Sequence, residues 1–152
     1  TSLKHQQTDG GYYMNIEYRE NAPIDVDALT ALYTDGGWTG YTDHPNKMAR
    51  MLAGSLWHMS AWDDGQLVGI IRCVGDGCSI LYIQDILVRE SYQRRGIGLH
   101  LLKAALTRWR DIRQTVLITH DATDTRAYYQ AAGFQLVEET DGLCYVHYNL
   151  DR

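Results

Sequence analysis

The alternation of hydrophobic and polar residues along the first half of the chain predicts strands and helices in a definite order. Residues 15–18 alternate as in a strand, and Asp25 precedes apolar residues at helical spacing, so that it can cap a helix. A second helix is expected near Pro45, because proline fits the first helical turn. Residues 57–62 and 67–74 are expected to pair as a hairpin, since the turn between them is rich in Asp and Gly.

The second half of the chain alternates strands with helices. A long strand is expected over residues 78–88, an amphipathic helix from residue 97 to about residue 110, and a short strand within residues 113–120. The short strand would run parallel to the long one, because a helical crossover joins them. A helix over residues 124–132 is expected to end at Gly133, and residues 134–137 and 143–150 are expected to form a final hairpin.

Composition and charge narrow the class of protein. The 152 residues, 45% hydrophobic and 22% charged, are typical of one soluble globular domain. A net charge of −5 argues against a nucleic-acid partner bound through a broad basic surface, and favours a cationic small partner. No apolar run approaches the ~20 residues of a membrane span, and no secretory segment is visible. We therefore expect a cytoplasmic protein with no membrane partner.

Two groups of residues are not assigned to a functional site. Residues 1–13 are polar and without a period, and we interpret them as a disordered lead-in or a cloning remnant, which leaves residues 14–152 as a single domain. Cys73, Cys78 and Cys144 follow no zinc-ligand spacing, and we interpret them as small core residues in a reducing compartment. The six histidines include no His-Glu-x-x-His pair, so no metal site is predicted.

A polar loop with two glycines joins the strand that ends at Val88 to the helix that begins at Ile97. Gly96 and Gly98 let the backbone approach a ligand closely, and the first N–H groups of the helix have no partner within it. Such a turn binds a phosphate or pyrophosphate. The alternative is that the glycines serve only a tight turn.

Two other phosphate-binding loops fit the sequence less well. A dinucleotide fold has a third glycine where this chain has His100 and Leu101. This chain also lacks the preceding strand-turn-helix unit with an acidic residue after it that such a fold has. A Walker loop needs Gly-Lys followed by Ser or Thr, which is absent.

Two separated motifs agree with one family. The first is Gln93-x-x-Gly96-x-Gly98, between a strand and a helix, and the second is Tyr129-x-x-x-Gly133-Phe134, after the next strand. In this order they resemble the GCN5-related N-acetyltransferase (GNAT) family, whose acetyl-CoA loop reads Q/R-x-x-G-x-G/A. The resemblance covers roughly residues 15–150. It implies an α/β GNAT fold, in which a mixed, mostly antiparallel sheet of about seven strands is flanked by about four helices and its central parallel pair splays at the acetyl-CoA site.

The resemblance also implies acetyl-CoA as cosubstrate and a set of residues that bind it. Backbone amides of the glycine loop would hold the pyrophosphate, and the strand before the loop would bond the pantetheine arm as a further strand does. The implied coenzyme-binding residues are Ile86, Leu87, Val88, Gln93, Arg94, Arg95, Gly96, Ile97, Gly98 and Leu99.

By the same resemblance, Tyr129 is the general acid that protonates the coenzyme A thiolate; the alternative is packing, or a hydrogen bond to the sulfur. The general base is less clear, because Gln84 stands where several members carry Glu, and Gln can hold a water but cannot accept its proton. Asp85 is a second candidate, although in a regular strand it points away from the face of Gln84 unless a bulge intervenes. The alternative for Asp85 is a structural role, in which backbone groups or a basic residue satisfy its carboxylate. A water relay through Gln84 and His120 is the third possibility.

The expected activity is transfer of an acetyl group to a primary amine of a small molecule, by direct attack in a ternary complex. We expect the acceptor between the 35–41 loop, the early helices and the final hairpin, where Asp35 and Asp43 suit a cationic amine. Trp38 and Tyr41 either line that pocket or cover the core as a lid, and the lid is favoured. Two alternatives are a protein-lysine acetyltransferase and a non-catalytic acetyl-CoA sensor. The acceptor and the oligomeric state stay open, a homodimer being one alternative.

Overall fold

The structure is a computed structural model that describes residues 3–9 and 12–150. It contains two compact units, Thr1–Ile118 and Thr119–Arg152. The strands are β1 Leu3–Asp9, β2 Tyr12–Glu20, β3 Trp57–Asp63, β4 Gln66–Gly75, β5 Ile80–Val88 and β6 Gln114–Leu117. The helices are α1 Val26–Asp35, α2 Thr39–Thr42, α3 Pro45–Ala53, α4 Ile97–Arg108 and α5 Thr123–Ala131, with single 3₁₀ turns at Glu90–Tyr92 and Val137–Thr140.

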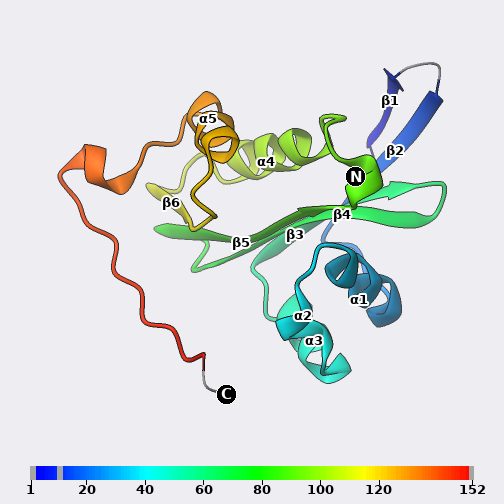
Figure 1. The fold of residues 1–152 in the computed structure, drawn as a ribbon, viewed down its shortest axis with the longest axis horizontal. Coiled ribbons are helices and arrows are strands. Elements are labelled where there is room, and N and C mark those ends of the chain that lie inside the picture. Colours follow the sequence, from blue (N-terminus) through cyan, green and yellow to red (C-terminus); the bar gives the residue numbers. More distant parts are fainter. Residues whose placement is uncertain (1–2, 10–11, 151–152) are drawn as a thin grey trace. The chain divides into compact units, whose positions relative to one another are not determined.

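The first unit is built on one mixed sheet. Its strands lie in the order β1-β2-β3-β4-β5-β6, with antiparallel pairing throughout except between β5 and β6, which are parallel (Figure 1). The helix α4 makes the crossover that parallel neighbours require. The prediction of a mixed, mostly antiparallel sheet with one parallel pair is confirmed. The described residues form six strands and five α-helices, where about seven and about four were expected.

Residues 3–9 form strand β1 of the first hairpin, whereas a disordered lead-in or cloning remnant was expected for residues 1–13. Strands β1 and β2 pair from Leu3–Tyr18 to Asp9–Tyr12. A polar strand needs no buried face to pair in this way, because the ladder satisfies backbone groups whatever the side chains are. The absence of a hydrophobic period was therefore a poor guide to this segment.

Helices cover both faces of the sheet. Helix α4 packs on one face, where Gly69 of β4 lets Ile97 and Leu101 approach the strand, and α1 and α3 pack on the other (Figure 1). The α1 side holds one hydrophobic cluster, whose buried members are Ile24, Leu29, Leu32, Tyr33, Met48, Trp62, Leu67, Ile70 and Leu87. The predicted helix and strand positions supply this core.

Local signals in the sequence correctly placed several element boundaries. The Asp25 side chain accepts a hydrogen bond from the Asp27 N–H at 2.8 Å and so caps α1. The β3–β4 turn has Asp64 and Gly65 at φ 48° and 80°, the left-handed conformation that a tight hairpin turn requires. Trp38 and Tyr41 pack against the α1 cluster, as expected for a lid.

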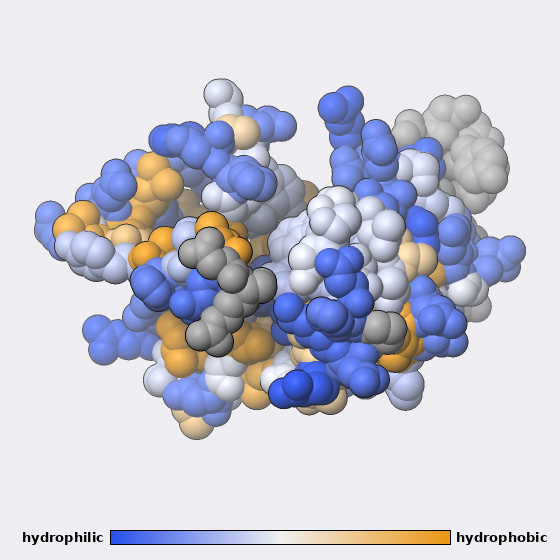
Figure 2. Space-filling view, turned by 60° about the horizontal axis from the view of Figure 1, so that its bottom comes forward, coloured by the Kyte–Doolittle hydropathy of each residue, from blue (hydrophilic) through white to orange (hydrophobic). Residues whose placement is uncertain are grey.

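The final hairpin is the element that the sequence predicted wrongly. No strand forms among residues 133–150; a 3₁₀ turn at Val137–Thr140 leads instead into irregular chain. The described residues of the second unit, 119–150, contain no strand, so residues 143–150 have no ladder partner there despite their strand-like alternation. Large exposed hydrophobic side chains occur here, including Leu143 at 70% and Tyr145 at 87% exposure. The face of the molecule drawn in Figure 2 shows orange, hydrophobic groups among hydrophilic ones.

The cysteines also differ in part from expectation. Cys73 is fully buried, and burial raises the pKa of its thiol to about 12, as for an inert core residue. Cys78 and Cys144 are exposed, so they are not core residues. The apolar residues around them misled the prediction. Within the described part of the chain, no helix has the length and apolar character that crossing a membrane requires.

Candidate active site

The glycine loop between β5 and α4 bends sharply twice. Arg94 and Gly96 have φ values of 62° and 83°, both left-handed, and Gly96 directly precedes α4. The Gln93 side chain donates from Nε2 to the Val88 carbonyl at 3.1 Å, which closes the loop onto the end of β5. A non-glycine residue such as Arg94 holds this conformation only when its surroundings enforce it.

Amide groups at the start of α4 point into this loop. The first helical hydrogen bond runs from the His100 N–H to the Gly96 carbonyl at 3.0 Å, and no side chain caps the helix. The N–H groups of Ile97, Gly98 and Leu99 therefore have no acceptor within the helix. Together with the positive end of the helix dipole they form an anion site, and Arg94 is exposed beside it.

Distant residues fasten the loop. Tyr92 donates its hydroxyl to Asp63 at 2.6 Å, and the Glu90 N–H donates to Asp35 at 2.9 Å. Asp35, expected near the acceptor, thus holds the phosphate-loop segment to the end of α1. Arg89 donates its Nε to the Leu67 carbonyl at 2.8 Å. No local pattern in the sequence signals these contacts.

Strand β5 has an open edge directly before the loop. Its parallel ladder with β6 ends at the Ile83–Leu117 pair, whereas its antiparallel ladder with β4 continues to Val88. The Arg89 N–H donates to the Val68 carbonyl, so it faces the β4 side. Because backbone groups alternate along a strand, those of Ile86 and Val88 face the open edge.

A bulge lies at the point where the two ladders part. Arg72 of β4 pairs with Asp85, but the next residue, Cys73, pairs with Ile83, so Gln84 has no counterpart on β4. A bulge of this kind bends its strand and re-aims the residues that follow. The sequence analysis had named a bulge as the condition that would change the direction of Asp85.

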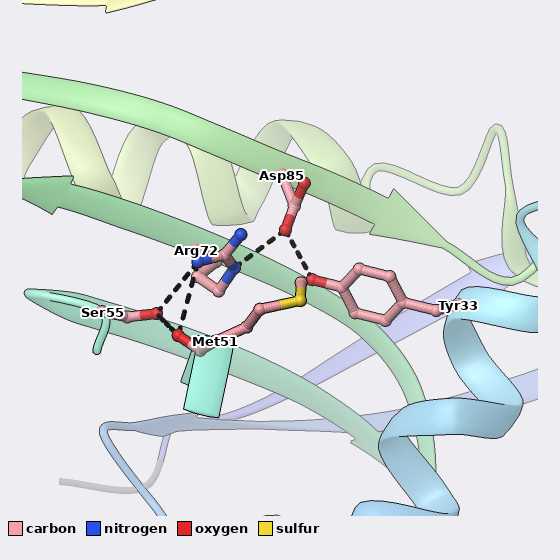
Figure 3. Close-up of polar contacts among 5 residues, drawn as sticks. All are labelled: Tyr33, Met51, Ser55, Arg72 and Asp85. Atoms are coloured by element: carbon pink, nitrogen blue, oxygen red, sulfur yellow. Dashed lines mark hydrogen bonds and ion pairs between the residues drawn. The ribbon is translucent and has the colours of Figure 1, made fainter. Parts of the chain in front are cut away.

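Asp85 is held in a buried network (Figure 3). Its Oδ2 accepts a hydrogen bond from the Tyr33 hydroxyl at 2.7 Å and another from Arg72 Nε at 2.8 Å. The residue is only 1% exposed, and its Oδ1 accepts no hydrogen bond from the described residues. Arg72 extends the network by donating from Nη1 to the Met51 carbonyl and to Ser55 Oγ, each at 3.4 Å.

The second unit contains the tyrosine motif, whose spacing has a local explanation. The Phe134 N–H donates to the Tyr129 carbonyl at 3.0 Å and the Gly133 N–H to the Gln130 carbonyl at 3.0 Å, with Gly133 at φ 95°. These bonds make a Schellman ending for α5, and the Phe134 ring packs edge-on against Tyr129 at 5.8 Å. Tyrosine, glycine and phenylalanine are therefore spaced as this helix ending requires.

A family model described as an acetyltransferase (GNAT) domain matches residues 32–152. The chain belongs to the GNAT acetyltransferase family. It is therefore an acyltransferase that depends on acetyl-CoA.

Solved structures agree with this assignment to the GNAT family. A GNAT family acetyltransferase from Streptococcus pneumoniae is 30% identical, with a TM-score of 0.78 over 90% of this chain and 99% of that one. Two further structures support the fold alone. An aminoglycoside N-acetyltransferase with coenzyme A is 21% identical, with a TM-score of 0.65 over 91% of this chain and 97% of that one. The PaiA N-acetyltransferase from Thermoplasma acidophilum with coenzyme A is 18% identical, with a TM-score of 0.64 over 79% of this chain and 89% of that one. No curated protein sequence matches the chain.

The GNAT residues predicted from sequence divide between the two units. The ten coenzyme-binding candidates lie together on β5, the glycine loop and the start of α4, as do Gln84 and Asp85. Tyr129 and His120 belong to the second unit. The side chains of Leu87 and Ile97 are buried in the core, so these two could serve a ligand only through their backbone.

Burial sets the protonation of the two tyrosines in this acetyltransferase. Burial raises the pKa of Tyr129, and a hydrogen bond to Thr119 acts in the opposite direction. Burial, and then the charge of Asp85, raise the pKa of Tyr33 further. Burial lowers the pKa of the Arg72 guanidinium, but the neighbouring Asp85 carboxylate raises it, and the pKa is raised overall.

The sequence analysis did not predict Arg72 and Tyr33 as the partners of the candidate residue Asp85. Arg72 is the one charged residue within the apolar run 67–74, and Asp85 is the one within 78–88. Charged side chains on two neighbouring buried strands normally pair. That signal could have predicted the ion pair, whereas nothing in the sequence connects Tyr33 to it.

Proposed function

We propose that this enzyme transfers the acetyl group of acetyl-CoA to a primary amine of a small molecule, by direct attack in a ternary complex. The observation that carries the proposal is the adjacency of two preformed binding surfaces. The free amides of Ile97, Gly98 and Leu99 follow directly after the open edge of β5. Coenzyme A has a pyrophosphate and a polyamide arm, which match these surfaces in kind and in order.

The coenzyme contacts follow from these surfaces. The pyrophosphate would accept hydrogen bonds from the α4 amides and from Arg94 or Arg95, and Gln93 would keep the loop closed through its bond to Val88. The pantetheine amides would pair with the backbone of Ile86 and Val88. Leu87 contributes by packing in the core and so anchoring the strand.

The chemistry requires one proton to leave the amine and one to reach the sulfur. The amine nitrogen attacks the thioester carbonyl carbon, the tetrahedral intermediate collapses, and the carbon–sulfur bond breaks. A backbone N–H at the Val88 end of β5 would donate to the oxyanion. Tyr129 would donate its phenolic proton to the departing thiolate.

The proton of the amine has two candidate acceptors in this proposal. Asp85 would accept it through the Oδ1 that has no partner in the network, or a water held by Gln84 would pass it to His120. The Asp85 carboxylate already accepts two hydrogen bonds at Oδ2, one of them from a guanidinium. These contacts match the alternative of a carboxylate satisfied by a basic residue, so the variant Asp85→Asn decides the assignment.

The aromatic residues that cover the α1 cluster could also contact an acceptor on their outer side. Tyr33 meets Trp38 and Tyr41 edge-on, at 6.2 Å each, and the latter two stack at 5.9 Å. Aromatic faces attract ammonium groups. The side chain of Asp43, which is exposed, would add negative charge near the same loop.

The test is calorimetric titration of the purified protein with acetyl-CoA, with ATP and NAD as comparators. Binding of acetyl-CoA alone is expected, followed by thiol release when primary amines are added. Activity confined to lysine peptides would favour the protein-lysine acetyltransferase instead. Tight acetyl-CoA binding with no thiol release from any amine would favour the sensor, which the Gln at position 84 suggests. Binding of a nucleotide in place of acetyl-CoA would overturn the proposal.

A further inference from the structure

Three features of the sheet meet around Gln84. The register of β4 against β5 shifts there, so that Gln84 has no counterpart on β4. The ladder between β5 and β6 ends one residue earlier, at Ile83. The ion pair between Arg72 and Asp85 joins the first two residues that pair after the shift.

The ion pair is tied to the helices under the sheet as well as to the two strands. Arg72 donates to the Met51 carbonyl of α3 and to Ser55 just after that helix, while Tyr33 of α1 donates to Asp85 (Figure 3). The two charged side chains are 8% and 0% exposed. A pair so deeply buried is costly to separate, so it holds its two strands at one register.

The bulge decides which backbone groups face the open edge. Backbone groups along a strand alternate in direction with a period of two, and one inserted residue shifts that alternation by one step. If β5 continued regularly past Ile83, the groups of Ile86 and Val88 would face β4 instead of the open edge.

We propose that the Arg72–Asp85 ion pair, supported by Tyr33, holds the bulge at Gln84 and so positions the backbone of Ile86 and Val88 to bind the pantetheine arm. Arg72, Asp85 and Tyr33 are then positioning residues, which act on the coenzyme through β5. This inference rests on the proposed function. It gives Asp85 a role that needs no proton transfer.

The experiment compares coenzyme A with its nucleotide end. Adenosine 3′,5′-bisphosphate lacks the pantetheine arm, so it reports on the glycine loop but not on the open edge. The dissociation constants of both ligands are measured by calorimetry for the parent, Asp85→Asn and Tyr33→Phe. The control is Ser60→Ala, because Ser60 is also fully buried and joins a hydrogen-bond network, to Trp62 and Arg19, away from the bulge.

In Asp85→Asn we expect the dissociation constant of coenzyme A to rise roughly tenfold or more, since small misplacements of binding groups have effects of this size. The constant for adenosine 3′,5′-bisphosphate should stay within about twofold of the parent, and Ser60→Ala should change neither. Tyr33→Phe keeps the ion pair, so it should show the same pattern at smaller size. It also keeps the test decisive if Asp85→Asn does not fold.

Two results would overturn the inference. One is unchanged coenzyme A affinity in a folded variant, as judged by its thermal unfolding. The other is equal weakening of both ligands, which would indicate general loss of structure. Failure of the parent itself to bind coenzyme A would instead overturn the proposed function. A further check is the pH profile of turnover, which should keep its shape in Asp85→Asn, because positioning requires no titration of this carboxyl group.

Discussion

Replacing Arg72 with methionine tests how the first unit is held together. The Asp85 carboxylate is 1% exposed and would lose Arg72, its only charged partner among the described residues, while it keeps the hydrogen bond from the Tyr33 hydroxyl. Breaking a buried pair in this way costs about 3–5 kcal/mol, a large share of the roughly 5–15 kcal/mol that stabilises a typical domain. Arg72→Met should therefore lower the free energy of unfolding by that amount.

The double variant Arg72→Met/Asp85→Leu separates charge from shape. Two apolar residues of similar volume leave no buried charge, so its free energy of unfolding should lie within about 1 kcal/mol of the parent or above it. The double variant should nevertheless bind coenzyme A weakly if the ion pair holds the bulge. Stability and coenzyme affinity would then change independently.

Urea unfolding followed by tryptophan fluorescence measures these values. All four tryptophans lie within residues 1–118, so the signal reports on the first unit even if the second unfolds separately. A loss below about 1 kcal/mol in Arg72→Met would refute the reasoning, since a broken buried pair costs more. So would a double variant as unstable as the single one, because the loss would then come from packing and not from charge.

Four other predictions concern the site directly. Tyr129→Phe should lower kcat by about 10²-fold or more and leave acetyl-CoA affinity nearly intact; an unchanged rate would remove the general-acid assignment. Gly98→Glu places a negative side chain among the α4 amides and should weaken coenzyme binding in calorimetry at least tenfold, as like charges repel. If Asp85 is the general base, Asp85→Asn should abolish the acid limb of the kcat profile, and a profile equal to the parent's would exclude that role. Because the pKa of Tyr33 is raised, the folded state keeps a proton that the unfolded state loses above about pH 10. The unfolding free energy should thus fall as pH rises past 10, and fall less steeply in Tyr33→Phe.

The glycine loop shows how much of a functional site a local pattern can predict. The strand, the loop and the helix were each placed within one to three residues, and Gly96 has the left-handed conformation expected of a glycine there. Each depends on contacts between residues close in the chain, which is why the sequence predicted them. The Tyr129 motif is equally local, because the Schellman ending of α5 accounts for the spacing of its tyrosine, glycine and phenylalanine.

Contacts between segments far apart in the chain could not be predicted from the sequence. Tyr33 and Asp85 are 52 residues apart, and Tyr92 and Asp63 are 29 apart. A hydrogen bond over such a separation depends on how strands and helices pack, and no spacing rule encodes it. The final hairpin failed for a related reason, since alternation identifies residues able to form a strand but does not supply a partner strand.

By itself, the sequence determined the order of β2 to β6 with α1, α3 and α4, the glycine loop before α4 and membership of an acetyltransferase family, because these depend on periodicity and on short motifs. Only the tertiary structure decided that Asp85 faces Arg72 and Tyr33, because the register shift at Gln84 that pairs Asp85 with Arg72 is a feature of strand pairing. One unpaired residue leaves no mark on hydrophobic periodicity. It nevertheless sets which backbone groups of β5 face away from β4.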